Sequence, residues 1–383
     1  MADKVYYCEN CGNIMEFDVK SQKLKCKSCG TTQMITNDQK SIVEHPYDKR
    51  AERKKQTEII EREEKTMECK GCGALIRVPG DVTSTACPYC GSQYVLSDKQ
   101  QDAITPDGVV PFKIDKNSGN EIFKTWISKR WLAPSRLKNL YEKGGLQGIY
   151  MPYWTFDADT YSRYDGEGGR DRQVKEKDKD GNVVTKTVTD WYPVTGHVEK
   201  FFDDVLVRAS ESLDGKLLKG IEPYNTTKEL NSYSPEYMSG YSAELYKIPI
   251  EDAHESATEI MESELKNMAE KDVRRTYDKV RNIRLDTRYS DETYKHVLVP
   301  IYSMAYNFEG KTYNVLINGE TGKIKGEAPV SKVKVIAIIL IVIAIIAGII
   351  AAANAKKTKG AQLETEASVE YEVVMEQDYN EVV

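Results

Sequence analysis

The sequence predicts an α+β protein built from several domains, and three observations lead to this prediction. All eight cysteines of the 383-residue chain lie before residue 91. Between residues 104 and 328, strand-like runs rich in valine and tyrosine alternate with amphipathic stretches of helical spacing. Near the other end, residues 335–353 are nineteen consecutive residues without a charge. We therefore expect cysteine-rich modules first, then an α+β domain with an antiparallel sheet, and then one long apolar helix.

The cysteines form a repeat in which Cys-x2-Cys, fourteen residues and a second Cys-x2-Cys occur twice, at an offset of 61 residues. The first set is Cys8, Cys11, Cys26 and Cys29, and the second set is Cys69, Cys72, Cys87 and Cys90. Two such turns can place four thiolates around one ion in the tetrahedron that structural zinc prefers. Each turn is followed by a glycine, which adopts positive φ without a Cβ clash. The pattern predicts two zinc ribbons, at residues 1–36 and 67–98, with two structural zinc ions.

Disulfides, an iron–sulfur cluster or a redox pair are the alternatives for these cysteines. The first eight residues lack the apolar stretch of a secretory signal, which favours a reducing cytosol over a disulfide-forming compartment. Because all four ligands of each site are thiolates, no position stays open for water or substrate. We expect both sites to be structural and the protein not to be an enzyme.

The charge of the ribbons argues against nucleic acid as their partner. Residues 1–36 carry five lysines and four acidic residues, and residues 67–98 carry two basic and three acidic residues. Nucleic-acid binders normally display a basic face that displaces counterions, and neither ribbon does. Residues 37–66 include a basic cluster, Lys49–Lys55, but Asp38–Lys65 balances eight basic against eight acidic side chains. We expect a charged helical linker there, with contact to anionic lipid or nucleic acid as the alternative.

The uncharged run predicts a transmembrane helix over residues 333–355. At 1.5 Å per residue, nineteen residues reach about 28 Å, which is close to the thickness of a bilayer's hydrocarbon core. A buried core helix is the alternative, but this run is apolar on all sides and lysines flank both of its ends. The numbers of lysines on the two sides of the helix are nearly equal, so they barely favour one orientation in the membrane. The thiols and the missing signal place the first 330 residues in the cytosol and residues 356–383, an acidic tail, outside the cell membrane.

In the central domain, residues 104–328, strands are expected at 183–188, 197–202, 205–208 and 297–308. Turns at Asn307–Lys311 and Asn318–Gly322 predict a small antiparallel meander. Helices are expected at Asn120–Trp131 and at Asp252–Ile283, where apolar residues recur every three or four positions.

The aromatic segment 148–159 has two interpretations. It is a core strand, or it lines a ligand groove with Tyr153, Trp154, Asp157 and Asp159. No base accompanies the two carboxylates in the sequence pattern, and no phosphate-binding loop follows a hydrophobic strand, so no catalytic residue is predicted. An enzyme that uses this strand stays the third class of function.

Several motifs follow one another along the chain. They are the two ribbons, Val110–Phe112, Trp131–Pro134, Tyr150–Trp154, Tyr241–Tyr246 and Asn318–Gly322. With these motifs in this order, the chain resembles the bacterial TFIIB-type zinc-ribbon-containing single-pass membrane proteins, an uncharacterised family. The resemblance implies no activity. It implies, as a partner hypothesis, envelope-stress proteins of the flotillin or phage-shock type.

These observations predict a membrane-anchored adaptor or scaffold that recruits a cytosolic protein partner to the membrane. The alternative is a transcription-related regulator that binds nucleic acid through its ribbons and the basic cluster.

Overall fold

The computed structural model describes residues 6–35, 41–48, 65–68, 75–78, 82–86, 93–95, 104–134, 145–177, 179 and 182–352. The chain divides into two compact units. One comprises Met1–Thr125 and Glu142–Glu327, and the other comprises Trp126–Tyr141 and Ala328–Val383. The described residues form a mixed α+β protein whose long strands pair antiparallel, as the sequence predicts.

Three very long strands form the framework of the first unit. Strand β10 (Gln147–Lys177) pairs antiparallel with β11 (Val183–Arg208) on one side and with β14 (Lys279–Phe308) on the other. The three strands expected between residues 183 and 208 are parts of the single strand β11. Beyond Gly169, where β14 ends its pairing, β10 and β11 continue as a two-stranded arm.

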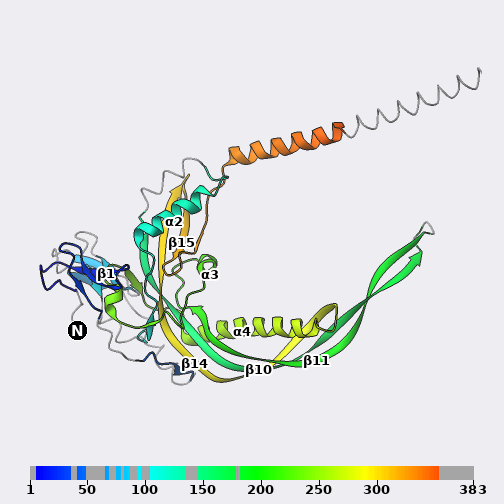
Figure 1. The fold of residues 1–383 in the computed structure, drawn as a ribbon, viewed down its shortest axis with the longest axis horizontal. Helices are drawn as coiled ribbons and strands as arrows, with labels where there is room; N and C mark the ends of the chain where they lie inside the picture. The colour runs from blue at the N-terminus through cyan, green and yellow to red at the C-terminus, as the bar shows by residue number, and fades with distance from the viewer. Residues whose placement is uncertain are drawn as a thin grey trace, which may run out of the picture. The chain divides into compact units, whose positions relative to one another are not determined.

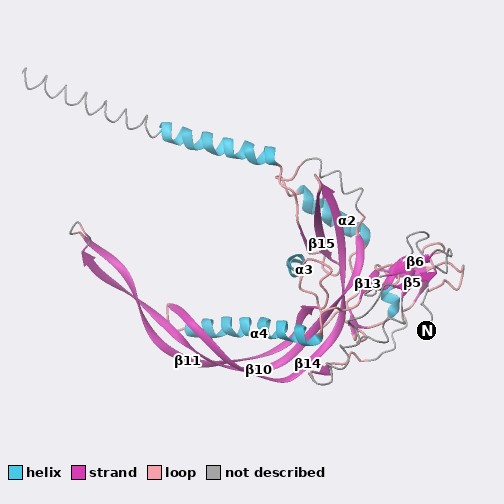
Figure 2. Ribbon diagram, turned by 180° about the vertical axis from the view of Figure 1, so that it is seen from behind, coloured by secondary structure: helices cyan, strands magenta, loops and turns pink. Residues whose placement is uncertain are grey.

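Helix α4 (Ile250–Val273) lies along the concave face of this sheet, as Figure 1 and the reverse view in Figure 2 show. Its buried residues recur every three or four positions, which matches one face of an α-helix. They are Ile250, Ala253, Ala257, Met261, Leu265, Ala269 and Val273. The expected end at Ile283 is wrong, because the chain leaves the helix at Val273 and the apolar residues near 280 belong to β14.

The predicted meander is confirmed at the end of β14. Strand β15 (Lys311–Asn318) pairs antiparallel with β14, and β16 (Ile324–Gly326) pairs antiparallel with β15. The first turn places Glu309 and Gly310 at φ of 49° and 76°. Two consecutive residues of positive φ are typical of a type I′ hairpin turn, whose twist matches that of the strands.

Two shorter helices lie next to the sheet that contains this meander. Helix α2 (Lys116–Ser128) starts one turn before the expected position, because the Asp115 carboxylate accepts a 2.8 Å hydrogen bond from the Ser118 amide. Helix α3 (Gly215–Ile221), which was not predicted, begins in the same way, with Asp214 accepting from the Leu217 amide at 2.9 Å.

Short strands attach the N-terminal region to the long sheet. β4 (His45–Pro46) pairs with β14, so the described part of the expected helical linker, residues 41–48, contains a short strand and no helix. β7 (Val82–Ala86) pairs with β13 (Ser242–Glu244), which itself runs parallel to β10. The other short elements are β1 (Met15–Asp18), β2 (Lys23–Cys26), β3 (Thr32–Gln33), β5 (Lys65–Glu68), β6 (Leu75–Val78), β8 (Gln93–Val95), β9 (Gly108–Val109), β12 (Asn231–Ser232) and the 3₁₀ helix η2 (Pro235–Met238).

In the second unit, the described residues include one long helix, Lys332–Ala352. Its 21 residues are long and apolar enough to cross a membrane, and none of its apolar window is buried inside the protein. A core helix of a soluble protein passes the same length and composition test but would be mostly buried.

Candidate metal centre and surface grooves

The first four cysteines come together at one point. Cys8 and Cys29 have their Sγ atoms 3.5 Å apart, and Cys11 and Cys26 have theirs 3.4 Å apart. All four sulfur atoms lie within 4.8 Å of one another. A tetrahedral ion with Zn–S bonds of about 2.3 Å requires sulfurs about 3.8 Å apart. The four thiols can therefore hold one zinc ion, with Cys8 and Cys26 on the buried side and Cys11 and Cys29 on the exposed side.

Two matching turns present these sulfur atoms. The amide of Gly12 donates to the Cys8 carbonyl at 2.8 Å, and the amide of Gly30 donates to the Cys26 carbonyl at 3.0 Å. Both glycines have positive φ, 73° and 76°, a backbone conformation that disfavours any residue with a Cβ. In the first cysteine set, the glycine after each pair thus closes its turn as the sequence pattern requires.

The thiols do not ionise equally. The Thr31 hydroxyl lies 3.1 Å from Cys29 Sγ, and with the Thr31 amide it lowers the pKa of Cys29 to about 5. At Cys11 the Asn13 amide lowers the pKa, but hydrogen bonds with the neighbouring thiols outweigh this and raise it to about 12. A divalent cation between the sulfurs removes this conflict, because it favours the thiolate form of all four.

Strand β1, which lies between Cys11 and Cys26 in the chain, docks on the segment 237–241. The Phe17 amide donates to the Ser239 carbonyl at 2.9 Å, and the Ser239 hydroxyl donates to the Met15 carbonyl at 2.8 Å. The Phe17 ring lies 5.2 Å from the Tyr237 ring and 6.4 Å from the Tyr241 ring. This cysteine module is therefore packed on the α+β core and not suspended on a free tether.

The same segment also contacts the second cysteine-rich region. The Ser84 hydroxyl, which is fully buried, donates to the Tyr241 carbonyl at 2.8 Å. The second cysteine set, Cys69, Cys72, Cys87 and Cys90, lies outside the described residues. Sequence reasoning missed the shared docking segment, which is separated from both cysteine sets by about 150 residues or more.

The residues expected in a ligand groove do not meet. Tyr153 and Trp154 are fully buried and point to opposite faces of the sheet, one towards α3 and the other towards α4. This outcome fits the core-strand interpretation of the segment. Asp157 is also buried, and only Asp159 lines an open surface groove.

Asp157 belongs instead to a buried ionic centre around Lys295, which sequence reasoning missed. The Lys295 side chain is 6% exposed, and its ammonium lies 2.8 Å from Asp204 Oδ1, 2.9 Å from Glu44 Oε1 and 3.8 Å from Asp157 Oδ2. Asp157 also accepts hydrogen bonds from the Asp204 amide at 2.6 Å and the Thr293 hydroxyl at 2.8 Å. Burial raises the pKa of Asp157 despite these contacts. The carboxylates of Asp157, Asp203 and Asp204 cluster here, but the chain's own Lys295 supplies the positive charge beside them.

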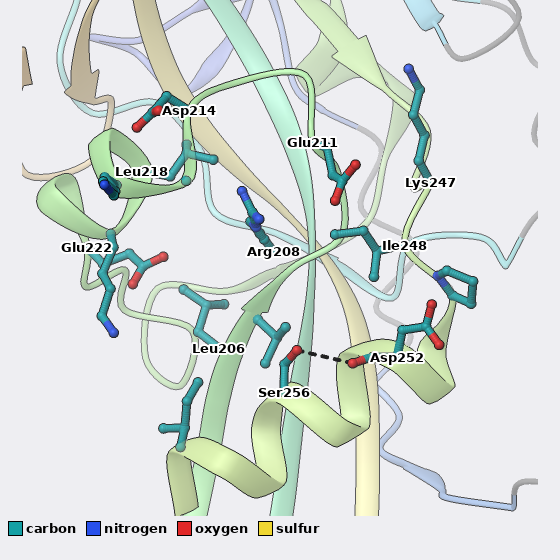
Figure 3. A pocket seen from close by; sticks show the side chains of 16 residues that line it. Leu206, Arg208, Glu211, Asp214, Leu218, Glu222, Lys247, Ile248, Asp252 and Ser256 are labelled. Atoms are coloured by element: carbon teal, nitrogen blue, oxygen red, sulfur yellow. Dashed lines mark hydrogen bonds between the residues drawn. The ribbon is translucent and has the colours of Figure 1, made fainter. Parts of the chain in front are cut away.

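One surface groove lies between α3, α4 and the end of β11, as Figure 3 shows. It has a volume of about 850 Å³. Arg208 stands between Asp214, at the start of α3, and Asp252, on α4. Cationic and anionic side chains are equally numerous in its lining, so its charge selects no class of ligand.

The second groove, of about 700 Å³, lies on the sheet face that points away from α4. Two aromatic side chains in it are exposed to solvent, Tyr161 at 38% and Phe201 at 56%. Arg288 lies directly across the strand pairing from Tyr161. No helix of the described chain covers this face.

The fold and the site together define a mixed α+β protein with a four-cysteine cluster and one candidate membrane helix. The chain is 29% identical over 343 residues to the uncharacterised protein YdjG of Bacillus subtilis (strain 168). That alignment covers 87% of this chain and 92% of the relative. No protein-family model matches the chain, and no solved structure matches it.

Proposed function

We propose that this protein is a single-pass membrane adaptor whose zinc-ribbon module and α+β domain hold a cytosolic protein partner beside the membrane. The observation that carries this proposal is the pairing of a closed four-thiol site with a 21-residue apolar helix that is not buried in the part of the chain that the structure describes. A site with four protein ligands has no open position for chemistry, and an apolar helix without protein contacts has no stable place in water. The combination supports scaffolding and not catalysis.

In this proposal, the first 330 residues lie in the cytosol, two zinc ions occupy the two cysteine sets, and the acidic tail lies outside. The orientation rests on the need of the thiols for a reducing compartment. A protease added to intact cells should remove a tag from the C-terminus. Protection of that tag, with cleavage only after lysis, would reverse the orientation.

We assign the partner to the sheet face that points away from α4, where the groove lined by Tyr161, Phe201 and Arg288 lies. Protein interfaces are enriched in exposed aromatic residues and arginine, and Tyr161, Phe201 and Arg288 gather on this face. Partners of the flotillin or phage-shock type are the hypothesis that the family resemblance supplies.

Affinity purification of the full chain from solubilised membranes tests the proposal. The variant Tyr161→Ala/Phe201→Ala should lose the partners that the unmodified chain retains. Tyr192→Ala is the matched control, because Tyr192 is 45% exposed but faces the α4 side of the sheet. Equal recovery from all three chains would remove this face as the interface.

Deletion of residues 1–98 and a nucleic-acid binding measurement complete the test. Loss of every partner on deletion would show that recognition needs residues 1–98, which supply β4, β7 and Glu44 to the α+β domain besides the cysteine modules. Binding of DNA or RNA by the full chain, with an affinity that falls steeply with salt, would favour the regulator and contradict the adaptor.

A further inference from the structure

The loop that follows α2 is bonded to the first turn of the apolar helix. The Ser331 amide donates to the Leu132 carbonyl at 2.9 Å. The Lys334 ammonium donates to the carbonyls of Trp131 and Ala133, both at 2.8 Å. Both segments belong to the same compact unit, so these bonds fix the loop beside the start of the helix.

This attachment determines the depth of the loop once the helix lies in a bilayer. The helix is about 31 Å long, and a hydrocarbon core is about 30 Å thick. Its first turn must therefore lie where hydrocarbon meets headgroups. Because the loop is held at that turn, it lies at the same level.

The loop presents the side chains that this level favours. Trp131 is 65% exposed although its backbone is held in place. The Arg130 guanidinium lies 4.0 Å above the Trp126 ring, so the aromatic and cationic groups are adjacent. Tryptophan is enriched at membrane interfaces because its ring is apolar and its N–H needs a polar partner.

The charge of this region points to an anionic surface. Within 126–134 and 328–334, which are all described, the charged side chains are Lys129, Arg130, Lys332 and Lys334, and none is acidic. Basic residues next to a membrane helix are attracted to acidic phospholipids of the cytoplasmic leaflet. A protein partner would more often offer a mixture of charges.

We propose that residues 129–132 form a second membrane contact, in which the Trp131 ring inserts at headgroup level and Lys129, Arg130 and Lys332 bind anionic lipid phosphates. This inference rests on the proposed membrane span. It adds a surface-lying anchor that fixes the rotation and tilt of the helix, which the apolar sequence alone leaves open.

Tryptophan quenching in vesicles tests this contact. The full chain is reconstituted into phosphatidylcholine vesicles with 30 mol% phosphatidylglycerol, in which the phosphatidylcholine carries bromine near the headgroup or deep in the acyl chain. We expect shallow bromines to quench at least twice as strongly as deep ones. Trp131→Phe should remove most of this difference, while the matched control Trp191→Phe should preserve it. Lys129→Glu/Lys332→Glu should halve the difference in the same vesicles.

An alkaline carbonate wash of the same vesicles separates the possible failures. Release of the unmodified chain by the wash would overturn the span and this inference together. Retention of the chain with equal shallow quenching of the unmodified chain and Trp131→Phe would overturn this inference alone. Crosslinking of residue 131 to a second copy, without lipid quenching, would also overturn it.

Discussion

Removal of the Lys295 ammonium should destabilise the α+β domain more than any ordinary surface change. In Lys295→Met, the side chain keeps much of its length but leaves Asp157 and Asp204, each 4% exposed, without their cation. Removing one partner of a buried ion pair costs about 3 to 5 kcal/mol, because an uncompensated charge stays buried. For a domain of about 220 residues, this loss corresponds to a fall in melting temperature of roughly 10 °C.

The pH dependence of this loss follows from the carboxylates. Burial already raises the pKa of Asp157, and loss of the ammonium raises it further. A carboxyl group whose pKa is raised in the folded state destabilises the fold above that pKa and ceases to do so once protonated. The difference between Lys295→Met and the unmodified chain should therefore be largest near neutral pH and should shrink as the pH falls towards 4.

Thermal unfolding followed by near-ultraviolet circular dichroism of the full chain in detergent measures both effects. The triple variant Lys295→Met/Asp157→Asn/Asp204→Asn is the control, because it removes the charges together and should recover much of the lost stability. A melting temperature of Lys295→Met within about 2 °C of the unmodified chain at pH 7 would refute the reasoning.

Three further perturbations follow from particular residues. Gly30→Ala places a Cβ at φ of 76° in open space, so its cost is conformational, about 1 to 2 kcal/mol, and zinc binding should weaken roughly 5- to 30-fold in a chelator competition. The control Gly145→Ala also places its Cβ in open space but has no positive φ, so it should bind zinc like the unmodified chain. Equal zinc affinity of the two variants would contradict the role of Gly30 in its turn. Burial lowers the pKa of His296 to about 4, below its unfolded value near 6.5, so the folded state binds fewer protons than the unfolded state. About 3 kcal/mol of stability should therefore be lost as the pH falls from 6.5 to 4. His296→Phe should flatten the stability profile between these pH values, and an unchanged slope would show that other groups cause the loss. Asn318 is fully buried, and its side chain donates to the carbonyls of Ile221 and Pro223 and accepts from the amides of Glu320 and Thr321. Asn318→Ala should therefore lower the free energy of unfolding, measured with denaturant, by about 2 to 4 kcal/mol. A decrease below about 1 kcal/mol would contradict the bridging role of Asn318.

The local features of the fold were predictable from the sequence because their causes are local. The glycines after the two pairs of the first cysteine set, the turn at Glu309 and Gly310, and the alanine-rich stripe of α4 each reflect a backbone angle or a periodicity within a few residues. The end of α4 was not predictable in this way. A three-residue apolar spacing continues past Val273 through Val280 and Ile283, and tertiary pairing with β10 decides that these residues form a strand.

The long-range features had no signal in the sequence. Lys295 meets Glu44 across 251 positions, and Ser239 meets Met15 across 224 positions. Pairings of this kind depend on the register of β10 between its two neighbours, which no local pattern determines. The sequence marks Asp157 as notable but not its partners, and its burial in an ionic centre differs from the ligand groove that was one of the two interpretations of its strand.

Zinc content of the full chain, purified from the membrane fraction, tests the central claim most directly. The account predicts two zinc ions per chain, reduced to one in Cys8→Ser/Cys11→Ser, with both chains retained in the membrane through an alkaline wash. Appreciably fewer than two zinc ions per unmodified chain, or recovery of the unmodified chain in the soluble fraction, would contradict it.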